Sequence, residues 1–212
     1  MGDLADKLRG KFLVIDGPDG AGKSTQLKLL VGHLRGRGVR VTETRDPGGT
    51  PIGDRIRDIL LDSAHKEMVI GCEILLYMAS RTQLMGEVIG PALQRDECVL
   101  CDRWVSSTIA YQAAGGGATA KEIMDIYEFA VRSRPDLIII LDVPADVGLA
   151  RISSPLDRME AKGETFHRKV RELFLAQAKE ASKTTTVLDG TGSVADVQDR
   201  LRACVESWRF LD

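Results

Sequence analysis

The feature that most constrains the fold of this 212-residue chain is a glycine-rich loop between a strand pattern and a helical pattern. Residues 12–16 read FLVID, and residues 17–25 continue with GPDGAGKST. This matches the Walker A pattern GxxxxGK[ST], whose backbone N–H groups and following helix N-terminus bind phosphates. We expect Lys23 to bridge two phosphates of a nucleoside triphosphate and the Ser24 hydroxyl to bind Mg²⁺. The predicted triphosphate-binding residues are Gly17, Pro18, Asp19, Gly20, Ala21, Gly22, Lys23, Ser24 and Thr25.

Short apolar runs alternate with helical patterns along the chain. Runs without polar alternation are typical of strands buried on both faces, which helical crossovers join into a parallel sheet. The sequence therefore predicts an α/β fold, a P-loop NTPase of three layers (α/β/α) with a five-stranded parallel sheet. Ligands of such sheets bind at the carboxyl ends of the strands. The predicted strands are residues 12–16, 39–44, 98–102, 137–142 and 185–188.

Helix-start signals fit the same plan. Thr50 precedes a proline, and the segments that begin at Thr119 and Ser193 read as capping boxes. The polar, breaker-rich segment at about residues 152–164 predicts a lid over the phosphate site. Because no linker divides the chain, we expect one domain over residues 1–212.

Charge and hydropathy argue against two classes of partner. Lys and Arg number 29 against 31 Asp and Glu, and a net charge of −2 provides no basic field for a nucleic acid. The longest aliphatic run, residues 137–141, is far shorter than the roughly 20 residues that span a bilayer. The start MGDLAD has no signal-peptide apolar region. We expect no nucleic-acid partner, no membrane association and a cytoplasmic location.

Cysteine and histidine provide no obvious chemistry. Cys98 and Cys101 have the spacing of a metal or redox pair, but residues three apart in a strand point to opposite faces. Cys72 and Cys204 lie in helical patterns, where we expect small apolar residues. The histidines lie outside the motifs, so we do not expect acid–base catalysis to be the main means of catalysis. Those predicted to be solvated are His33, His65 and His167.

Three arginine-containing segments fall where the topology would bring them to one edge of the sheet. They are RDPGGT from Arg45, SRTQL around Arg81 and DRW around Arg103. The planar guanidinium group suits an acceptor phosphate and a transferring phosphoryl group. Arg45 and Arg103 each follow a strand, which favours a functional role, whereas Arg81 alone would as readily lie on a solvated helix face. A second phosphate site predicts a phosphotransferase; a nucleotide-driven switch would not need one.

Together these motifs resemble the thymidylate kinases, specifically the bacterial form, from Lys11 to about Trp208. The resemblance rests on GPDGAGKST, TRDPGGT, LLYMASRTQL, CDRW with SSTIAYQ, RPDLIIILDV and LDRME. It implies that the chain phosphorylates dTMP to dTDP with ATP and Mg²⁺. It also implies a homodimer packed through helices that include residues 72–84. The alternative is another (deoxy)nucleoside monophosphate kinase with a different base pocket.

The resemblance also implies roles for single residues. Arg45, Arg81 and Arg103 would surround the acceptor phosphate, the ring of Tyr77 would stack on thymine, and Tyr111 would crowd a ribose 2′-hydroxyl. The residues implied to bind dTMP are Asp19, Arg45, Tyr77, Arg81, Arg103, Ser107, Tyr111 and Gln112.

Catalysis is expected from Lys23, Arg103, Asp19 and an arginine of the lid. Gly20 stands where some family members carry a P-loop arginine, so the lid should supply that charge. Arg158 is the first candidate and Arg151 the second. The expected metal ligands are Ser24 and Asp102.

Overall fold

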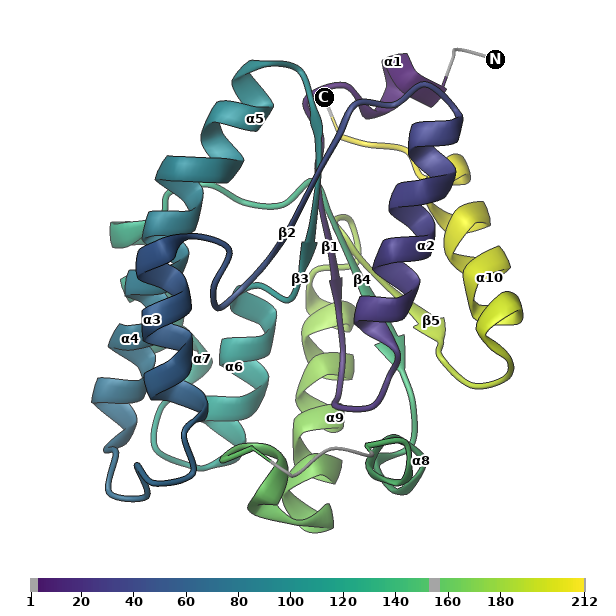
Figure 1. Ribbon diagram of the computed structural model, residues 1–212. Helices are drawn as coiled ribbons and strands as arrows, with labels where there is room; N and C mark the ends of the chain where they lie inside the picture. The colour runs from purple at the N-terminus through teal and green to yellow at the C-terminus, as the bar shows by residue number, and fades with distance from the viewer. Residues whose placement is uncertain (1–3, 153–156, 212) are drawn as a thin grey trace.

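The computed structural model describes residues 4–152 and 157–211 and has three layers around a central sheet (Figure 1). All neighbouring strands are parallel, in the order β2-β3-β1-β4-β5, which confirms the predicted fold class. The strands are β1 (Phe12–Asp16), β2 (Val41–Arg45), β3 (Cys98–Asp102), β4 (Leu137–Asp142) and β5 (Thr185–Asp189).

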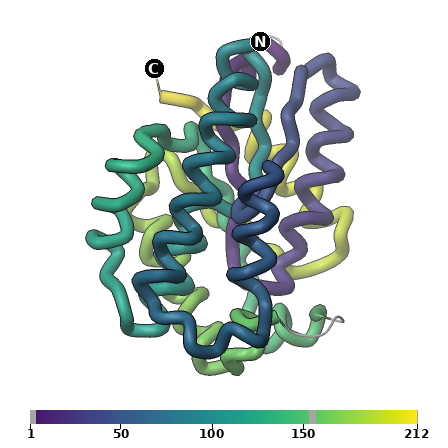
Figure 2. The backbone as a smooth tube through the Cα atoms, turned by 60° about the vertical axis from the view of Figure 1, so that its left-hand side comes forward, coloured from purple at the N-terminus to yellow at the C-terminus, as the bar shows by residue number. Residues whose placement is uncertain are grey.

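Helices cover both faces of the sheet (Figures 1 and 2). One face packs on α1 (Leu4–Leu8), α2 (Lys23–Gly36) and α10 (Val194–Ser207). The other packs on α4 (Ile70–Leu84), the π-helix η1 (Met85–Ile89), α5 (Gly90–Gln94), α6 (Val105–Ala114), α7 (Ala120–Ala130) and α9 (Glu164–Glu180). Beside them lie α3 (Pro51–Leu61), α8 (Ala145–Ala150) and the 3₁₀ turn η2 (Glu160–Lys162).

Alternation along the central strands divides the core between the two faces. Leu13 and Ile15 of β1 pack toward α2 and α10, whereas Phe12 and Val14 pack toward α4 and α6. Cys98 and Cys101 of β3 are likewise buried in different clusters, so the expectation that they cannot form one ligand set is confirmed. Cys72 and Cys204 lie in helices, as predicted; Cys72 is exposed on α4 and Cys204 is partly buried on α10.

The central strands are buried on both faces, as predicted, but the two edge strands are not. β2 and β5 keep partly exposed residues because each has a neighbouring strand on one side only. β2 also begins two residues later than predicted. Its ladder starts at the Val41–Cys98 pair, while the N–H of Val39 donates to Leu34 at the end of α2.

The predicted helix starts are confirmed. Thr50 accepts a hydrogen bond from the N–H of Gly53, and Thr119 and Ser193 each form a reciprocal capping box. Within the described ranges, no helix is both long and apolar enough to cross a membrane.

The P-loop and α8 approach each other backbone to backbone. A Cβ atom on Gly148 would lie well inside van der Waals contact with the carbonyl oxygen of Asp19, and a Cβ on Gly20 would overlap the carbonyl of Gly148. Glycine at both positions therefore sets the distance between α8 and the P-loop.

We expect Gly148→Ala to destabilise the protein by about 1–3 kcal/mol, because α8 must move away from Asp19. Gly32→Ala is the matched control. Gly32 lies in α2, where an added Cβ would meet no atom within 4 Å, so this change should stabilise by about 0.5–1 kcal/mol. Urea denaturation measures both free energies of unfolding. Equal effects of the two substitutions would contradict the close-packing argument.

Candidate active site

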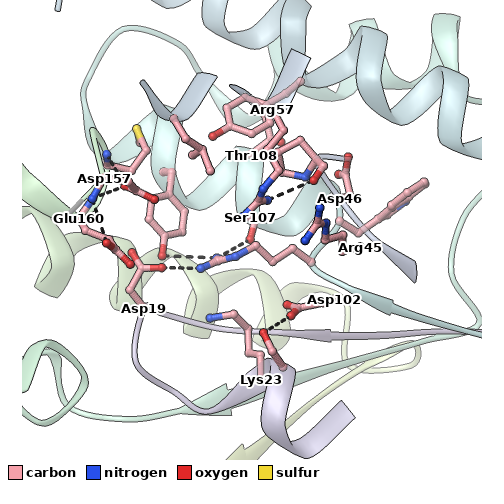
Figure 3. Close-up of a pocket in the computed structure, with 18 of the residues that line it drawn as sticks. Asp19, Lys23, Arg45, Asp46, Arg57, Asp102, Ser107, Thr108, Asp157 and Glu160 are labelled. Atoms are coloured by element: carbon pink, nitrogen blue, oxygen red, sulfur yellow. Dashed lines mark hydrogen bonds and ion pairs between the residues drawn. The ribbon is translucent and has the colours of Figure 1, made fainter. Parts of the chain in front are cut away.

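A cavity of about 380 Å³ lies at the carboxyl ends of β1, β2 and β3 (Figure 3). β1 pairs with β3 on one side and β4 on the other, so the chain reverses direction across the sheet there. Parallel sheets bind ligands at such switch points. The P-loop, the β2–α3 loop, α4, α6 and residues 157–160 line this cavity.

The P-loop has the backbone of an anion cradle. Gly17, Gly20 and Gly22 adopt positive φ angles of 135°, 71° and 85°, and α2 begins at Lys23. The Lys23 ammonium donates to the carbonyl of Pro18 at 2.7 Å. Burial, followed by the positive charge of Arg103, lowers the pKa of Lys23 to about 8. The charge of a bound polyanion would favour the protonated ammonium and offset this lowering, so the loop is arranged for negative charge.

The fully buried carboxylate of Asp16 joins the P-loop to the start of α6. Its Oδ1 accepts from the Gly17 N–H at 2.9 Å and the Ser107 hydroxyl at 2.6 Å. Its Oδ2 accepts from the Ser106 hydroxyl at 2.6 Å and the Trp104 N–H at 3.4 Å. One side chain therefore fixes the loops that follow two neighbouring strands.

Ser24 and Asp102 face each other beside Lys23. The Ser24 hydroxyl donates to Asp102 Oδ2 at 2.5 Å, and Asp102 Oδ1 is buried without a hydrogen-bond partner among the described residues. The part of the chain that the structure describes has no cluster of three His, Cys, Asp or Glu for a metal. A hydroxyl and one carboxylate fit Mg²⁺ that takes its remaining ligands from phosphates and water.

Besides Arg81, three arginines line the cavity: Arg45, Arg57 and Arg103. Figure 3 labels Arg45 and Arg57. Arg45 pairs with Asp54 at 3.2 Å, and Arg57 donates to the carbonyl of Pro47 at 3.1 Å. Burial and the charges of Arg45 and Arg103 lower the pKa of Arg57. Like charges held this close indicate a site for a second anion.

Arg81 also lines the cavity, and its charge is paired inside the protein. Its side chain is 1% exposed, and its guanidinium pairs with Asp46 at 2.5 Å and donates to Thr108 at 2.8 Å. Burial raises the pKa of Asp46, and Arg81 opposes that shift. Arg81 also lies over the Trp104 ring at 5.3 Å. Arg81 therefore lines the cavity from a fully buried position, and Arg57 adds a guanidinium group that the sequence did not identify.

Arg103 connects residues of the P-loop and α6 beside the cavity. The residue has φ 71°, a strained backbone conformation that recurs at functional sites. Its guanidinium pairs with Asp19 and donates to Ser107 at 3.1 Å and to the Tyr111 hydroxyl at 3.4 Å. The structure thus brings together four residues that the sequence predicted separately.

Asp19 and His167 lie next to each other beside Arg103. Although burial raises the pKa of Asp19, Arg103 and Lys23 outweigh it and lower the pKa. His167 is 2% exposed, so the prediction that it is solvated was wrong. Its Nε2 donates to the carbonyl of Glu160 at 3.1 Å, and its Nδ1 lies 3.7 Å from Asp19 Oδ2. Neither His167 Nδ1 nor Asp19 Oδ2 has a hydrogen-bond partner within the described ranges, which leaves Asp19 Oδ2 able to accept from a ligand hydroxyl.

Tyr77 and Gln112 line the far end of the cavity. Burial, followed by the charge of Glu73, raises the pKa of Tyr77, so the phenol stays neutral. The Gln112 amide donates to Glu73 at 2.7 Å. An aromatic face beside an amide is suited to a planar heterocycle.

The two candidate lid arginines lie apart. Arg158 donates to the Leu60 carbonyl at 2.9 Å and to Glu73 at 3.1 Å, on the α3 and α4 side of the cavity. Arg151 instead reaches the carbonyls of Gly20 and Gly190 at 3.4 and 3.2 Å. The structure does not bring Arg158 to Lys23 and Arg103. Of the predicted lid at 152–164, residues 153–156 lie outside the described residues.

Several residues of the site were not identified from the sequence. Asp16 could have been suspected, because it ends the first strand directly before the P-loop. Asp46, Thr108 and Glu160 lie in the motifs RDPGGT, SSTIAYQ and LDRME, but no role was predicted for them. Arg57 and Glu73 lie in helices with nothing local to mark them as part of a site, and only packing directs them inward.

Comparisons with known proteins agree with one another. A family model described as thymidylate kinase matches residues 15–201. The thymidylate kinase of Pseudomonas fluorescens is 45% identical over 197 residues, which covers 92% of this chain and 94% of the relative. That of Ectopseudomonas mendocina is 42% identical over 203 residues, covering 94% and 97%. The crystal structure of thymidylate kinase from Ehrlichia chaffeensis matches with a TM-score of 0.75 at 28% identity, covering 92% and 98%.

We expect Asp16→Asn to lower the free energy of unfolding by about 1–3 kcal/mol. The new amide would point its NH₂ group at one of two backbone N–H donors, and a buried donor would lose its acceptor. Urea denaturation provides the measurement. Asp199→Asn, on an exposed part of α10, is the control and should stay within about 0.5 kcal/mol of the wild type. A loss no larger than the control's would contradict the role assigned to Asp16.

Proposed function

Since the chain belongs to the thymidylate kinase family, we propose that it transfers the γ-phosphoryl group of ATP to the 5′-phosphate of dTMP. The observation that carries this proposal is a P-loop and a cluster of three arginines on one cavity. Two anions held side by side are what transfer between two phosphorylated nucleotides requires. The products are ADP and dTDP.

The P-loop is the proposed ATP site. Residues 17–25 would wrap the phosphates with backbone N–H groups, and Lys23 would lie at the β- and γ-phosphates. Ser24 and Asp102 would hold Mg²⁺, which supplies charge neutralisation of the phosphates when bound. Their facing oxygens and the unpartnered Asp102 Oδ1 support this assignment.

The acceptor phosphate is assigned to Arg45, Arg57 and Arg103. All three line the cavity, and burial together with the charges of Arg45 and Arg103 lowers the pKa of Arg57, which supports one shared anion site. Arg81 lines the same cavity from a fully buried position, where it pairs with Asp46, and stays a proposed dTMP-binding residue.

The remaining walls fit a deoxynucleoside. Asp19 Oδ2 would accept the sugar 3′-hydroxyl, and Tyr111, packed beside Arg103, would crowd a 2′-hydroxyl. Tyr77 would stack on the base, an interaction worth roughly 1–3 kcal/mol, and Gln112 would contact the edge of the base. Ser107 supports the Arg103 guanidinium.

The chemistry needs no protein base. An oxygen of the dTMP phosphate is itself the nucleophile; its bond to the γ-phosphorus forms as the bond between that phosphorus and the β–γ bridging oxygen breaks. Lys23 and Arg103 would stabilise the charge on the transferring group, and Asp19 would hold Arg103 in place.

Residues 152–164 are the proposed lid. Asp157, Met159 and Glu160 line the cavity, and Arg158 ties this segment to α3 and α4. Arg158 would therefore anchor the lid, and Arg151, next to Gly20, is the lid arginine closer to the ATP site.

The proposed compartment is the cytoplasm, where ATP and nucleoside monophosphates occur together. The four cysteines are all free, and two of them are buried in separate clusters, which suits a reducing compartment. Fractionation of the source cells should recover the chain with cytosolic marker enzymes; recovery elsewhere would contradict this assignment.

A second copy of this chain is the proposed partner. On α4, Cys72, Leu75, Ala79 and Thr82 repeat at helical spacing and are all exposed. On the neighbouring α3, Ile52 and Ile59 are 54% and 42% exposed. An apolar face of this kind on two packed helices fits a self-complementary interface.

Sedimentation should then give twice the 23.2 kDa mass of the chain. Leu75→Glu should shift the protein toward monomer, because it places charge in the apolar face. Phe129→Glu, at a 79% exposed position on α7, is the control and should leave the mass unchanged. A monomeric wild type would contradict the proposed dimer.

The function itself is tested by ADP release from ATP and Mg²⁺, with each common nucleoside monophosphate offered in turn and one reaction without acceptor. We expect dTMP to be the preferred acceptor. Lys23→Ala should lower kcat by a factor of about 100 or more, because the triphosphate loses its buried cation. Lys28→Ala, on the exposed face of α2, is the control and should leave kcat unchanged.

Two outcomes would contradict the proposal in different ways. Preference for another monophosphate would keep the phosphotransferase but replace the base assignment, as in the alternative kinase class. Hydrolysis that is independent of acceptor would contradict phosphoryl transfer altogether.

A further inference from the structure

Glu73 is a buried carboxylate that lies behind the cavity. It is 2% exposed on the inner face of α4, one turn before Tyr77, and is absent from the residues that line the cavity. Its two oxygens have different partners: Oε1 accepts from the Gln112 amide at 2.7 Å, and Oε2 accepts from Arg158 at 3.1 Å. Arg158 provides the positive charge without which a buried carboxylate would be strongly unfavourable.

This contact decides which way the Gln112 amide points. An ionised carboxylate only accepts hydrogen bonds, so the NH₂ group of Gln112 must face Glu73. The amide oxygen is thereby turned away from Glu73. Gln112 is 1% exposed and lines the cavity, and its Oε1 has no hydrogen-bond partner in the described part of the chain. An unpaired buried acceptor of this kind favours a ligand that brings a donor.

We propose that Glu73 is a positioning residue for base specificity, which fixes the Gln112 amide so that the pocket accepts a ring N–H from the base. The inference rests on the proposed function and adds the reason for base choice. Thymine and uracil carry a donor N–H at N3. Cytosine carries a lone pair there, which would face the oxygen of Gln112 acceptor to acceptor.

The second oxygen of Glu73 extends this role to the lid. Arg158 lies between Asp157 and Met159, two of the residues that line the cavity. One carboxylate therefore holds both the amide that reads the base and the segment that covers it. Glu73 contacts neither nucleotide in this arrangement and acts through its two partners.

The test is Glu73→Gln, an isosteric change that removes the fixed acceptor. Arg158 can only donate, so the new amide would keep its oxygen on Arg158 and turn its NH₂ group to Gln112, whose oxygen would then leave the base. The ratio of kcat/KM for dTMP over dCMP should fall about tenfold or more, since one discriminating hydrogen bond is lost. KM for ATP should be unchanged, because the P-loop is not involved.

Glu87→Gln is the matched control. Glu87 also accepts from a glutamine amide, that of Gln83 at 2.8 Å, but on the exposed surface of the π-helix. It should leave the dTMP/dCMP ratio at the wild-type value. An unchanged ratio in Glu73→Gln, or an equal fall in both variants, would overturn the inference.

A double substitution distinguishes a positioning role of Glu73 from general damage to the fold. In the exchange E73Q with Q112E, the amide at 73 donates to a carboxylate at 112, which again presents an oxygen to the base. Gln112→Glu alone places two carboxylates against each other. The exchange should recover at least tenfold in kcat/KM for dTMP over Gln112→Glu. No recovery would overturn the inference, and this comparison holds even where Glu73→Gln alone does not fold.

The wild-type reaction distinguishes this inference from the proposed function. A wild type that uses no monophosphate contradicts the function, whatever the variants do. A wild type that prefers dTMP, together with a Glu73→Gln variant that keeps the full preference, contradicts only the role of Glu73.

Discussion

The active-site end of the sheet depends on the buried carboxylate of Asp16. It receives four hydrogen bonds, from the P-loop on one side and from the first turn of α6 on the other. Gly17 and Trp104, which supply the two backbone donors, lie outside the helices and strands, so the relative position of the P-loop and α6 would otherwise be set by loop geometry. Because the Asp16 contacts fix it, Arg103 and Tyr111 stand at a defined distance from Lys23, as a transfer site requires.

The cavity keeps several positive charges close together in the absence of a ligand. The charge of Arg103 adds to burial in lowering the pKa of Lys23, and the charges of Arg45 and Arg103 add to burial in lowering the pKa of Arg57. Asp19 pairs with Arg103 and offsets part of this positive charge. Two anionic nucleotides would neutralise the remaining positive charge, so the protein is arranged in advance for the charge that develops during transfer.

Base recognition depends on residues farther from the reacting atoms. In the proposed site, Tyr77 would provide an apolar face that any base can use, whereas the Gln112 amide can distinguish donors from acceptors only if it cannot turn. The Glu73 carboxylate removes that freedom, and it also pairs with Arg158, whose neighbours Asp157 and Met159 line the same cavity. Specificity in this site is therefore a property of buried hydrogen bonds between elements and does not belong to one residue.

The sequence by itself determined the sheet, the P-loop and the capped helices, because short apolar runs, glycine spacing and capping hydroxyls act over a few neighbouring residues. Tertiary structure alone decided which charges meet. It buried Arg81 against Asp46, turned Arg57 into the cavity and enclosed His167, since these contacts join residues up to 148 positions apart, as for His167 and Asp19. It also placed Arg158 on Glu73, away from the P-loop. Local patterns show that a side chain lies on a helix, but packing between helices sets what that side chain faces.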